Sequence, residues 1–316
     1  MTTPRSERSL ASLLLVHRLA KSSADPLKAG QYWPLFHRVP HLEELLGLAA
    51  AEIVQRYELT AELADQIAAR LDGATALAFR LDDLEQAGLQ ALTPVDADYP
   101  AVLVDRVSSP PPVLYLAGDP KLLVSSLLGI VGSRNVDEAG ADIARAAARE
   151  AVRHGHGVAS GGAKGVDQLS MRAALEAGGT VVGVLADPLL RSLRDPETRR
   201  AVVDGRVCLC TPYKPEAGFS VANAMGRNKL IYALAAATLV VASEEDSGGT
   251  WAGAKEALAS GRPVLSWLGS GAGPGNAALV GRGAIRLTEM DQLFPLPAAP
   301  GPIDPPPVKQ QLTLGI

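Results

Sequence analysis

The first ninety residues carry apolar side chains at spacings of three and four, the pattern of helices that bury one face. This spacing predicts helices over residues 9–19, 41–57, 60–71 and 81–89, joined by short links. Thr60 is a suitable N-cap, and Gly73 and Gly88 are suitable helix stops. We expect residues 1–92 to form a small helical accessory domain.

The pattern changes at Thr93, where prolines interrupt the helical spacing. Pro94, Pro100 and the run from Pro110 to Pro112 fit neither a helix interior nor a central strand. Residues 93–119 are therefore predicted to be a connector, with a lead-in strand over residues 113–117.

From Leu127 onward, short apolar runs alternate with longer amphipathic stretches. The runs predict strands over residues 127–131, 157–160, 180–185, 207–210, 238–242, 263–268 and 284–287. The stretches predict helices over residues 138–154, 166–177, 222–236 and 250–260. Such alternation indicates an α/β fold with a parallel sheet covered on both faces. We expect a doubly wound, mostly parallel Rossmann-like domain over residues 120–294, followed by a flexible, proline-rich tail over residues 295–316.

Composition narrows the class of protein. The chain has 316 residues, of which 47% are hydrophobic and 20% charged, so a chain disordered throughout is excluded. A net charge of -4 argues against a polycation that coats nucleic acid, but it leaves room for a local basic groove. No apolar run is long enough to cross a membrane, so we expect a soluble, cytoplasmic protein without a membrane partner. Cys208 and Cys210 are interpreted as reduced structural thiols.

Three glycine-rich turns follow predicted strands, where a doubly wound sheet has its ligand crevice. They contain the candidate phosphate-binding residues, which are Gly132, Ser133 and Arg134 in the first turn, Ser160, Gly161, Gly162, Lys164, Gly165 and Asp167 in the second, and Ser247, Gly248, Gly249 and Thr250 in the third. Paired glycines let a polyanion approach the backbone, and helix starts offer amide donors. Thr250 is expected to cap the helix that carries Glu256.

Structural alternatives exist for the charged members of these turns. Arg134 and Lys164 would be ordinary solvated cations if each turn stood alone. Asp167 would stabilise the first turn of its helix through the macrodipole.

A basic stretch runs from Arg191 to Lys229, with eight basic and four acidic residues. Near its end, Arg227 and Lys229 flank Asn228 among apolar helix positions, so the two cations are expected to share a short polar edge. We expect a local positive patch, and a common rim that joins Arg134, Gly161, Gly162 and Lys229.

Several chemistries lack a sequence signal. The chain has no G-x-x-x-x-G-K-S/T phosphate loop, no nucleophile elbow and no histidine or carboxylate cluster with metal-ligand spacing. His154 and His156 flank a turn and are interpreted as solvated or capping residues. No catalytic residue, metal or cofactor is expected.

Taken together, the three turns and the Gly226 to Leu230 segment resemble the DprA/Smf family of DNA-processing proteins, within the wider SLOG superfamily of Rossmann-like domains. The similarity extends upstream to the segments 98–100 and 110–115 and covers about two thirds of the chain. It implies single-stranded DNA binding, a homodimer, loading of the RecA recombinase and a SAM-like fold for the N-terminal helices. By this resemblance, Arg134 and the turn from Ser160 to Lys164 hold phosphates, and Arg227, Asn228 and Lys229 extend the groove.

The sequence departs from the family pattern at several positions. Lys229 replaces the last arginine of the usual Arg-Asn-Arg, and Lys164 replaces the arginine of the usual Gly-Ala-Arg-Gly. Gln168 to Ser170 stand where a histidine is common. No winged-helix module follows the predicted sheet. A role in genome or phage defence beside a toxin or nuclease therefore stays open next to transformation.

Two further functions stay open. Nucleoside monophosphate phosphoribohydrolases of the same superfamily use P-G-G-x-G-T-x-x-E, but the segment 247–256 lacks both the proline and a glutamate at that spacing. A sensor of a nucleotide-derived ligand would use the same amide cradle.

The end of the tail also resembles a known peptide. Gln311, Leu312 and Leu314 resemble the Q-L-x-L-F peptide that docks on the polymerase sliding clamp, although Gly315 replaces the aromatic anchor. The alternative is a featureless tail.

Overall fold

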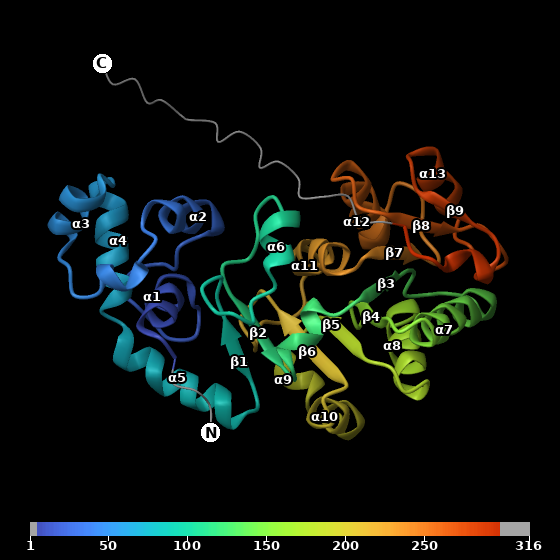
Figure 1. Ribbon diagram of the computed structural model, residues 1–316, viewed down its shortest axis with the longest axis horizontal. Helices are drawn as coiled ribbons and strands as arrows, with labels where there is room; N and C mark the ends of the chain where they lie inside the picture. The colour runs from blue at the N-terminus through green and yellow to red at the C-terminus, as the bar shows by residue number, and fades with distance from the viewer. Residues whose placement is uncertain (1–4, 298–316) are drawn as a thin grey trace, which may run out of the picture.

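The computed structural model describes residues 5–297, and within that range helices α1 to α5 lie beside a nine-stranded sheet with helices on both faces (Figure 1). The clamp-like peptide with Gln311, Leu312 and Leu314, and the tail from residue 298, lie outside the described residues. No helix in the described range is long and apolar enough to span a membrane.

The sheet is doubly wound around β3 (Leu127–Val131). On one side of β3 lie β4 (Gly157–Ser160), β5 (Val181–Val184) and β6 (Val207–Thr211), and on the other lie β7 (Ala237–Val240), β8 (Val264–Trp267) and β9 (Ile285–Leu287), all parallel. Two antiparallel strands, β2 (Leu114–Ala117) and β1 (Gln90–Leu92), extend the β6 edge. The predicted α/β fold with a mostly parallel sheet is confirmed.

Helices cover both faces of the sheet, and nearly every strand residue is therefore buried. One face packs against α7 (Glu138–Arg153), α8 (Val166–Glu176), α9 (Leu189–Ser192) and α10 (Pro196–Val203). The other packs against α6 (Ala101–Arg106), α11 (Val221–Leu234), α12 (Gly248–Ala259) and α13 (Asn276–Gly281). Two short 3-10 helices, η2 (Pro120–Val124) and η3 (Met290–Leu293), complete this part of the chain. Cys208 and Cys210 are buried as free thiols on β6, and burial raises the pKa of Cys210 to about 12.

The N-terminal helices differ from the sequence prediction in three places. They are α1 (Glu7–Val16), α2 (Ala29–Arg38), η1 (Leu42–Leu45), α3 (Ala50–Tyr57), α4 (Ala61–Leu71) and α5 (Ala74–Gln86). The predicted helix 41–57 is broken, because Gly47 adopts a φ of +79° between η1 and α3. α2 went unpredicted because Gly30 and Pro34 obscure its pattern, and α5 begins at Ala74 and not at residue 81. Gly73 follows the end of α4, as predicted for a helix stop, and is also the N-cap of α5.

Of the remaining predictions about where helices and strands begin and end, some are confirmed and some are wrong. Thr60 caps α4 as expected, since its hydroxyl accepts a hydrogen bond from the Leu63 amide at 3.3 Å. β1 lies inside the range assigned to the helical accessory domain and belongs to the sheet. α6, α9, α10 and α13 went unpredicted because helices of four to eight residues show too little periodicity.

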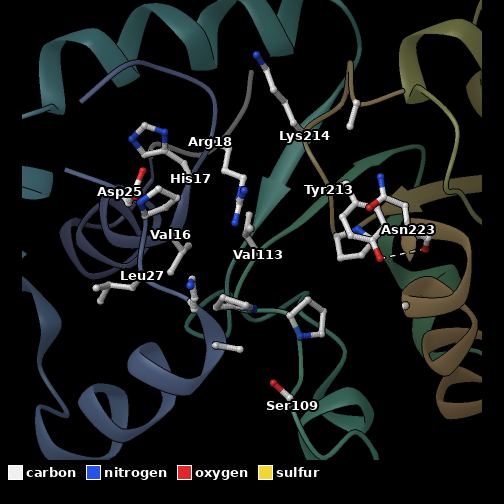
Figure 2. A pocket seen from close by; sticks show the side chains of 18 of the residues that line it. Val16, His17, Arg18, Asp25, Leu27, Ser109, Val113, Tyr213, Lys214 and Asn223 are labelled. Atoms are coloured by element: carbon white, nitrogen blue, oxygen red, sulfur yellow. Dashed lines mark hydrogen bonds between the residues drawn. The ribbon is translucent and has the colours of Figure 1, made fainter. Parts of the chain in front are cut away.

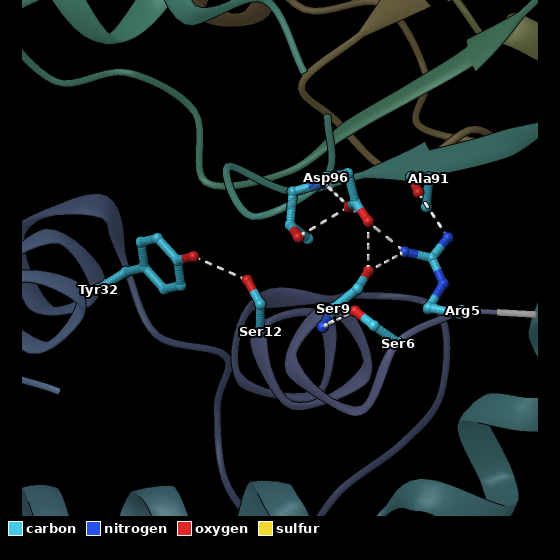
Figure 3. Close-up of polar contacts among 8 residues, drawn as sticks. Arg5, Ser6, Ser9, Ser12, Tyr32, Ala91 and Asp96 are labelled. Atoms are coloured by element: carbon cyan, nitrogen blue, oxygen red, sulfur yellow. Dashed lines mark hydrogen bonds and ion pairs between the residues drawn. The ribbon is translucent and has the colours of Figure 1, made fainter. Parts of the chain in front are cut away.

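A polar cluster fastens the N-terminal helices to the strand edge (Figure 3). The Ser9 hydroxyl donates to Asp96 at 2.6 Å, and the Arg5 guanidinium donates to the carbonyl of Ala91 at 2.7 Å. Nearby, the Trp33 indole N–H donates to the carbonyl of Pro110 at 2.9 Å. Because these contacts join α1 and α2 to β1 and the connector, the helical part is held in a defined position against the sheet.

A buried arginine organises the loop after α1. Arg70 is 1% exposed, and its guanidinium donates to the carbonyls of Leu14 and His17 at 2.9 and 2.8 Å. His17 is also buried, and its Nδ1 accepts a hydrogen bond from the Leu19 amide at 3.2 Å. Burial, together with the nearby Arg70 cation, lowers the pKa of His17 to about 3. The imidazole therefore stays neutral in the fold near neutral pH.

We expect acid to destabilise the fold through His17. The unfolded imidazole takes up a proton near pH 6.5, while the folded one resists until about pH 3, so stability is lost as pH falls through that window. His17→Asn keeps an acceptor without the titration. Its unfolding free energy in urea should fall less than that of the wild type between about pH 7 and about pH 4.5. The exposed His37→Asn is the control; equal acid sensitivity in His17→Asn and the wild type would contradict the assignment.

Candidate nucleic-acid interface

The three glycine turns meet at one edge of the sheet, beyond the carboxyl ends of β3, β4 and β7. A cavity of about 700 Å³ opens there, and we call it the glycine crevice. Its lining includes residues 132–134, Ala163 and Asp167, residues 247–250, and Phe219, Val221 and Met225. The expected convergence of the turns is thus present in the structure, at the point where the chain order reverses around β3.

The first turn is packed tightly against the start of α8. A Cβ atom on Gly132 would lie 2.6 Å from Val166, so only glycine fits there. The Ser133 hydroxyl accepts a hydrogen bond from the Asn135 amide at 3.1 Å. The Arg134 guanidinium lies over the ring of Phe219 at 4.9 Å, and within residues 5–297 it forms no salt bridge. Its charge is therefore available at the crevice surface.

The second turn packs against the first. Gly165 has a φ of +87°, and a Cβ atom there would lie 2.4 Å from the Ser133 carbonyl oxygen. Ser160 is buried, and its hydroxyl donates to the Ile130 carbonyl at 2.6 Å, so it braces β4 against β3 and is not exposed to a ligand. Lys164 is exposed but faces a neighbouring cavity, which it shares with Arg134 and Gly162.

Arg227 corrects the expectation for both the groove and the paired glycines. It is 4% exposed, and its Nη1 donates to the Val184 carbonyl at 2.7 Å. A Cβ atom on Gly161 would lie 1.5 Å from that nitrogen, so Gly161 makes room for the guanidinium and not for a polyanion. Arg227 therefore supports the turn from behind instead of extending an exposed groove.

Asp167 is the buried partner of this arginine. Its carboxylate lies 3.9 Å from Arg227 Nη2 and accepts a hydrogen bond from the Ala163 amide at 3.4 Å. Burial raises the pKa of Asp167, while the guanidinium opposes that shift. Asp167 lies in the first turn of α8, as the macrodipole alternative requires, and it also supports the glycine turn through Arg227 and Ala163.

The third turn begins α12, but not as predicted. Ser247 occupies the N-cap position and α12 begins at Gly248, so Thr250 is the third helical residue and not the cap. The Asn228 side-chain amide donates to the Gly249 carbonyl at 3.0 Å, which ties α11 to this turn. The first amides of α12 open toward the crevice and are donors for an anion.

Lys229 does not share the rim with Arg134 and the double glycine. Its ammonium lies 2.8 Å from the Glu256 carboxylate, and it lines cavities on the other side of α11. Arg227 and Lys229 also share no polar edge, since one is buried and the other exposed. Arg227 and Lys229 point to different sides of α11 because positions two residues apart on a helix are turned away from each other. The prediction of a common rim is therefore wrong for Lys229, whereas Arg134 and Gly162 do line the same cavity.

The predicted positive patch over residues 191–229 is also dispersed. Arg191, Arg199 and Arg200 belong to α9 and α10, on the opposite face of the sheet from α11. Arg206 donates to the carbonyl of Leu175, near the end of α8, at 3.2 Å. Besides the buried pair of Asp167 and Arg227, the carboxylates of Glu244 and Asp246 line the glycine crevice, so its positive charge comes from Arg134 and Lys255.

Phe219 is the site residue that the sequence did not reveal. It is 42% exposed, in a chain whose large apolar residues are mostly buried, and Val221 and Met225 beside it are 68% and 47% exposed. The only sequence signal is an aromatic residue in an irregular segment after Gly218, where no periodicity marks a role. Contact with Arg134 across the crevice appears only in the fold.

The floor of the crevice holds buried donors. Among the described residues, the Tyr232 hydroxyl, Trp251 Nε1 and Arg227 Nε have no hydrogen-bond partner. Because these three atoms are shielded from solvent, they are unpaired inside the protein and are not open to a ligand in the crevice. Within residues 5–297 no group of three histidine, cysteine or acidic residues is arranged to hold a metal ion.

The two histidines near the end of α7 make other contacts. His154 is the C-cap of α7 and stacks on the ring of Phe294 at 4.3 Å, and the Ser126 hydroxyl forms a hydrogen bond with His156 at 2.8 Å.

The sheet order, the crevice at its switch point and the braced glycine turns define a Rossmann-like protein. A family model described as DNA recombination-mediator protein A matches residues 90–296, and the chain belongs to this family. Its resemblance to DprA/Smf DNA-processing proteins is thereby confirmed.

Relatives and solved structures agree. DNA processing protein DprA of Bacillus subtilis is 29% identical over 214 residues, which cover 66% of this chain and 71% of the relative. A putative DNA processing protein DprA of Mycobacterium tuberculosis is 30% identical over 266 residues, which cover 77% of this chain and 66% of the relative. The crystal structure of DprA from Streptococcus pneumoniae matches with a TM-score of 0.70 at 19% identity, over 92% of this chain and 97% of that one. A Helicobacter pylori DprA structure, described by its single-stranded DNA binding mode, matches with a TM-score of 0.53 at 20% identity, over 65% and 93%.

Substitution of Gly161 tests the brace. In Gly161→Ala the new methyl group occupies the place of the Arg227 guanidinium, so we expect a loss of about 1–3 kcal/mol in unfolding free energy, as in other overpacked interiors. Gly30→Ala is the matched control: nothing lies within 4 Å of its new methyl group, and alanine favours the helix. Urea unfolding measures both, and equal stabilities for the two variants would refute the brace.

Proposed function

We propose that this protein binds single-stranded DNA without sequence preference and acts as a non-enzymatic mediator in DNA recombination. The observation that carries the proposal is the Arg134 guanidinium over the exposed Phe219 ring, directly beside the helix starts of the glycine crevice. Cations and backbone amides bind phosphates of any sequence, and an aromatic ring stacks on any base. The single-stranded DNA binding mode named for the Helicobacter pylori relative supports the same reading.

The strand would follow the rim of the crevice. Residues Gly132 to Arg134 and the α12 start at Ser247 to Thr250 face it from two sides, and Lys164 and Gly162 extend the rim beyond Arg134. The buried Arg227, Asp167 and Ser160 hold these turns in place and make no contact with the strand.

The wider role also rests on family membership. We propose a homodimer that passes the strand to a RecA-type recombinase, in DNA uptake or recombination. A toxin or nuclease partner in a defence module is the alternative. Acceleration of RecA assembly on strands coated with single-strand-binding protein supports the first role, and its absence favours the second.

Arg134→Ala tests phosphate binding. Removing one charge-assisted contact should cost about 1.5–3 kcal/mol, or about 10- to 100-fold in affinity, for every oligonucleotide sequence. The slope of log affinity against log salt should fall by about 0.7. Fluorescence anisotropy with oligo-dT and mixed sequences measures both. Arg149→Ala removes an exposed charge on α7 outside the cavities and should change neither; a loss confined to particular bases in Arg134→Ala would argue against backbone recognition.

Phe219→Ala tests stacking. We expect a loss of about 1–3 kcal/mol in binding to oligo-dT, with Phe219→Trp close to the wild type. An abasic strand offers phosphates and no base, so its affinity should be the same for the wild type and Phe219→Ala. If the alanine variant weakens both ligands equally, the ring acts by holding Arg134 and not by stacking.

The volume of the glycine crevice, about 700 Å³, favours one competing function, a sensor of a small nucleotide-derived ligand. Calorimetric titration with AMP against oligo-dT separates the two, because a sensor binds the mononucleotide more tightly than the strand. The phosphoribohydrolase alternative has weaker support, since Glu256 faces Lys229 and not the crevice. Release of free base from AMP would establish it.

A further inference from the structure

A second cavity lies at the junction of the N-terminal helices, the connector and α11 (Figure 2). We call it the junction cleft. It has a volume of about 940 Å³ and is separate from the glycine crevice. Six cations line it, against a single carboxylate, that of Asp25; they are the buried Arg70 and, nearer the surface, Arg18, Lys21, Lys28, Lys214 and Lys229. In a chain with a net charge of -4, this is a concentrated positive surface.

Most of this charge is uncompensated. Arg18, Lys21 and Lys28 are exposed, and none forms a salt bridge within the described part of the chain. Lys214 lies 3.9 Å from Glu216, and Lys229 lies 2.8 Å from Glu256. Figure 2 shows Arg18 extending from the loop after α1 into the space opposite Tyr213 and Asn223. The cleft therefore offers cations from both of its walls.

The walls of the cleft are fixed. Buried Arg70 holds the carbonyls around the loop that carries Arg18 and Lys21, and the Tyr213 hydroxyl donates to the Asn223 carbonyl at 3.0 Å on the opposite wall. The Trp33 hydrogen bond to Pro110 and the Ser9 bond to Asp96 set the distance between the two parts. A braced backbone that carries the cations loses little freedom when a ligand arrives.

The junction cleft and the glycine crevice share one wall, the first turns of α11. Asn223, Gly226 and Lys229 line the cleft, while Ala224, Met225 and Asn228 line the crevice. A helix with its side chains is about 10–12 Å across, so a strand that leaves the crevice crosses one helix to enter the cleft. The exposed Val221 and Met225 lie on that path.

We propose that the junction cleft holds a second stretch of the same single strand, so that the N-terminal helices add to the DNA footprint. This inference rests on the proposed function of the crevice. The exposed cations come from separate segments of the chain, the loop after α1, the segment after β6 and α11, so the cleft offers more positive charges than one phosphate needs.

The test compares short and long strands. Arg18→Ala/Lys21→Ala removes two exposed cleft charges that form no side-chain hydrogen bond within residues 5–297. With an oligo-dT of about 20 nucleotides, the double variant should bind about 10-fold more weakly or worse, and its salt slope should fall by about 1.4. With an oligo-dT of about 6 nucleotides, which the crevice alone accommodates, its affinity should equal that of the wild type.

Two controls separate this proposal from the function of the crevice. Arg149→Ala/Arg199→Ala removes two exposed charges outside the cavities and should leave both lengths unaffected. If Arg134→Ala weakens both lengths while the cleft variant weakens neither, the crevice function stands and the cleft proposal is overturned. Loss of dTMP binding in the cleft variant, with long-strand binding intact, would also overturn it in favour of a small-ligand site. Failure of the wild type to bind either oligonucleotide would overturn the crevice function itself.

Discussion

The buried guanidinium of Arg227 is the contact on which the candidate site depends. It lies in the space that the missing side chain of Gly161 leaves, donates to the Val184 carbonyl at the end of β5, and balances the buried carboxylate of Asp167 at the start of α8. One side chain from α11 thereby connects the ends of β4 and β5 with α8. A buried charge is stable only with a partner of this kind, so the arrangement constrains the turn strongly.

Because Arg227 is used as a brace, the residues around the crevice divide into those that support the turns and those that are open to a ligand. Charged residues that the motif suggests as ligands serve as frame, and the groups left to meet a polyanion are backbone amides, Arg134 and the neighbouring Lys164. The proposed phosphate binding thus relies on fixed dipoles and few charges, which suits a protein whose overall charge is negative. Phe219 adds an apolar surface that is open to solvent, in contact with the one guanidinium that stays at the crevice surface.

The N-terminal helices are joined to the sheet by polar contacts and share its buried core. Arg70 and His17 order the loop after α1, and that loop carries cations toward α11. The helical part is therefore built into the surface that surrounds α11. This placement supports the proposed nucleic-acid footprint over both parts, in a chain whose family is described as DNA recombination-mediator protein A.

The sequence by itself determined the α/β class, the positions of the seven parallel strands and the three glycine turns, because buried strands and strand-to-helix turns leave local patterns. The turns form where the glycines predicted them, since Gly162, Gly165 and Gly248 adopt positive φ angles that favour glycine. The roles of individual side chains were decided only by the tertiary structure. Arg227 and Lys229 are two positions apart in sequence, yet one is buried behind the crevice and the other faces a different cavity, because the helix turns them to different sides. The role of Phe219 and the existence of the junction cleft could not be predicted from local sequence patterns either. Both depend on contacts between segments that are distant in sequence, and periodicity carries no information about such contacts.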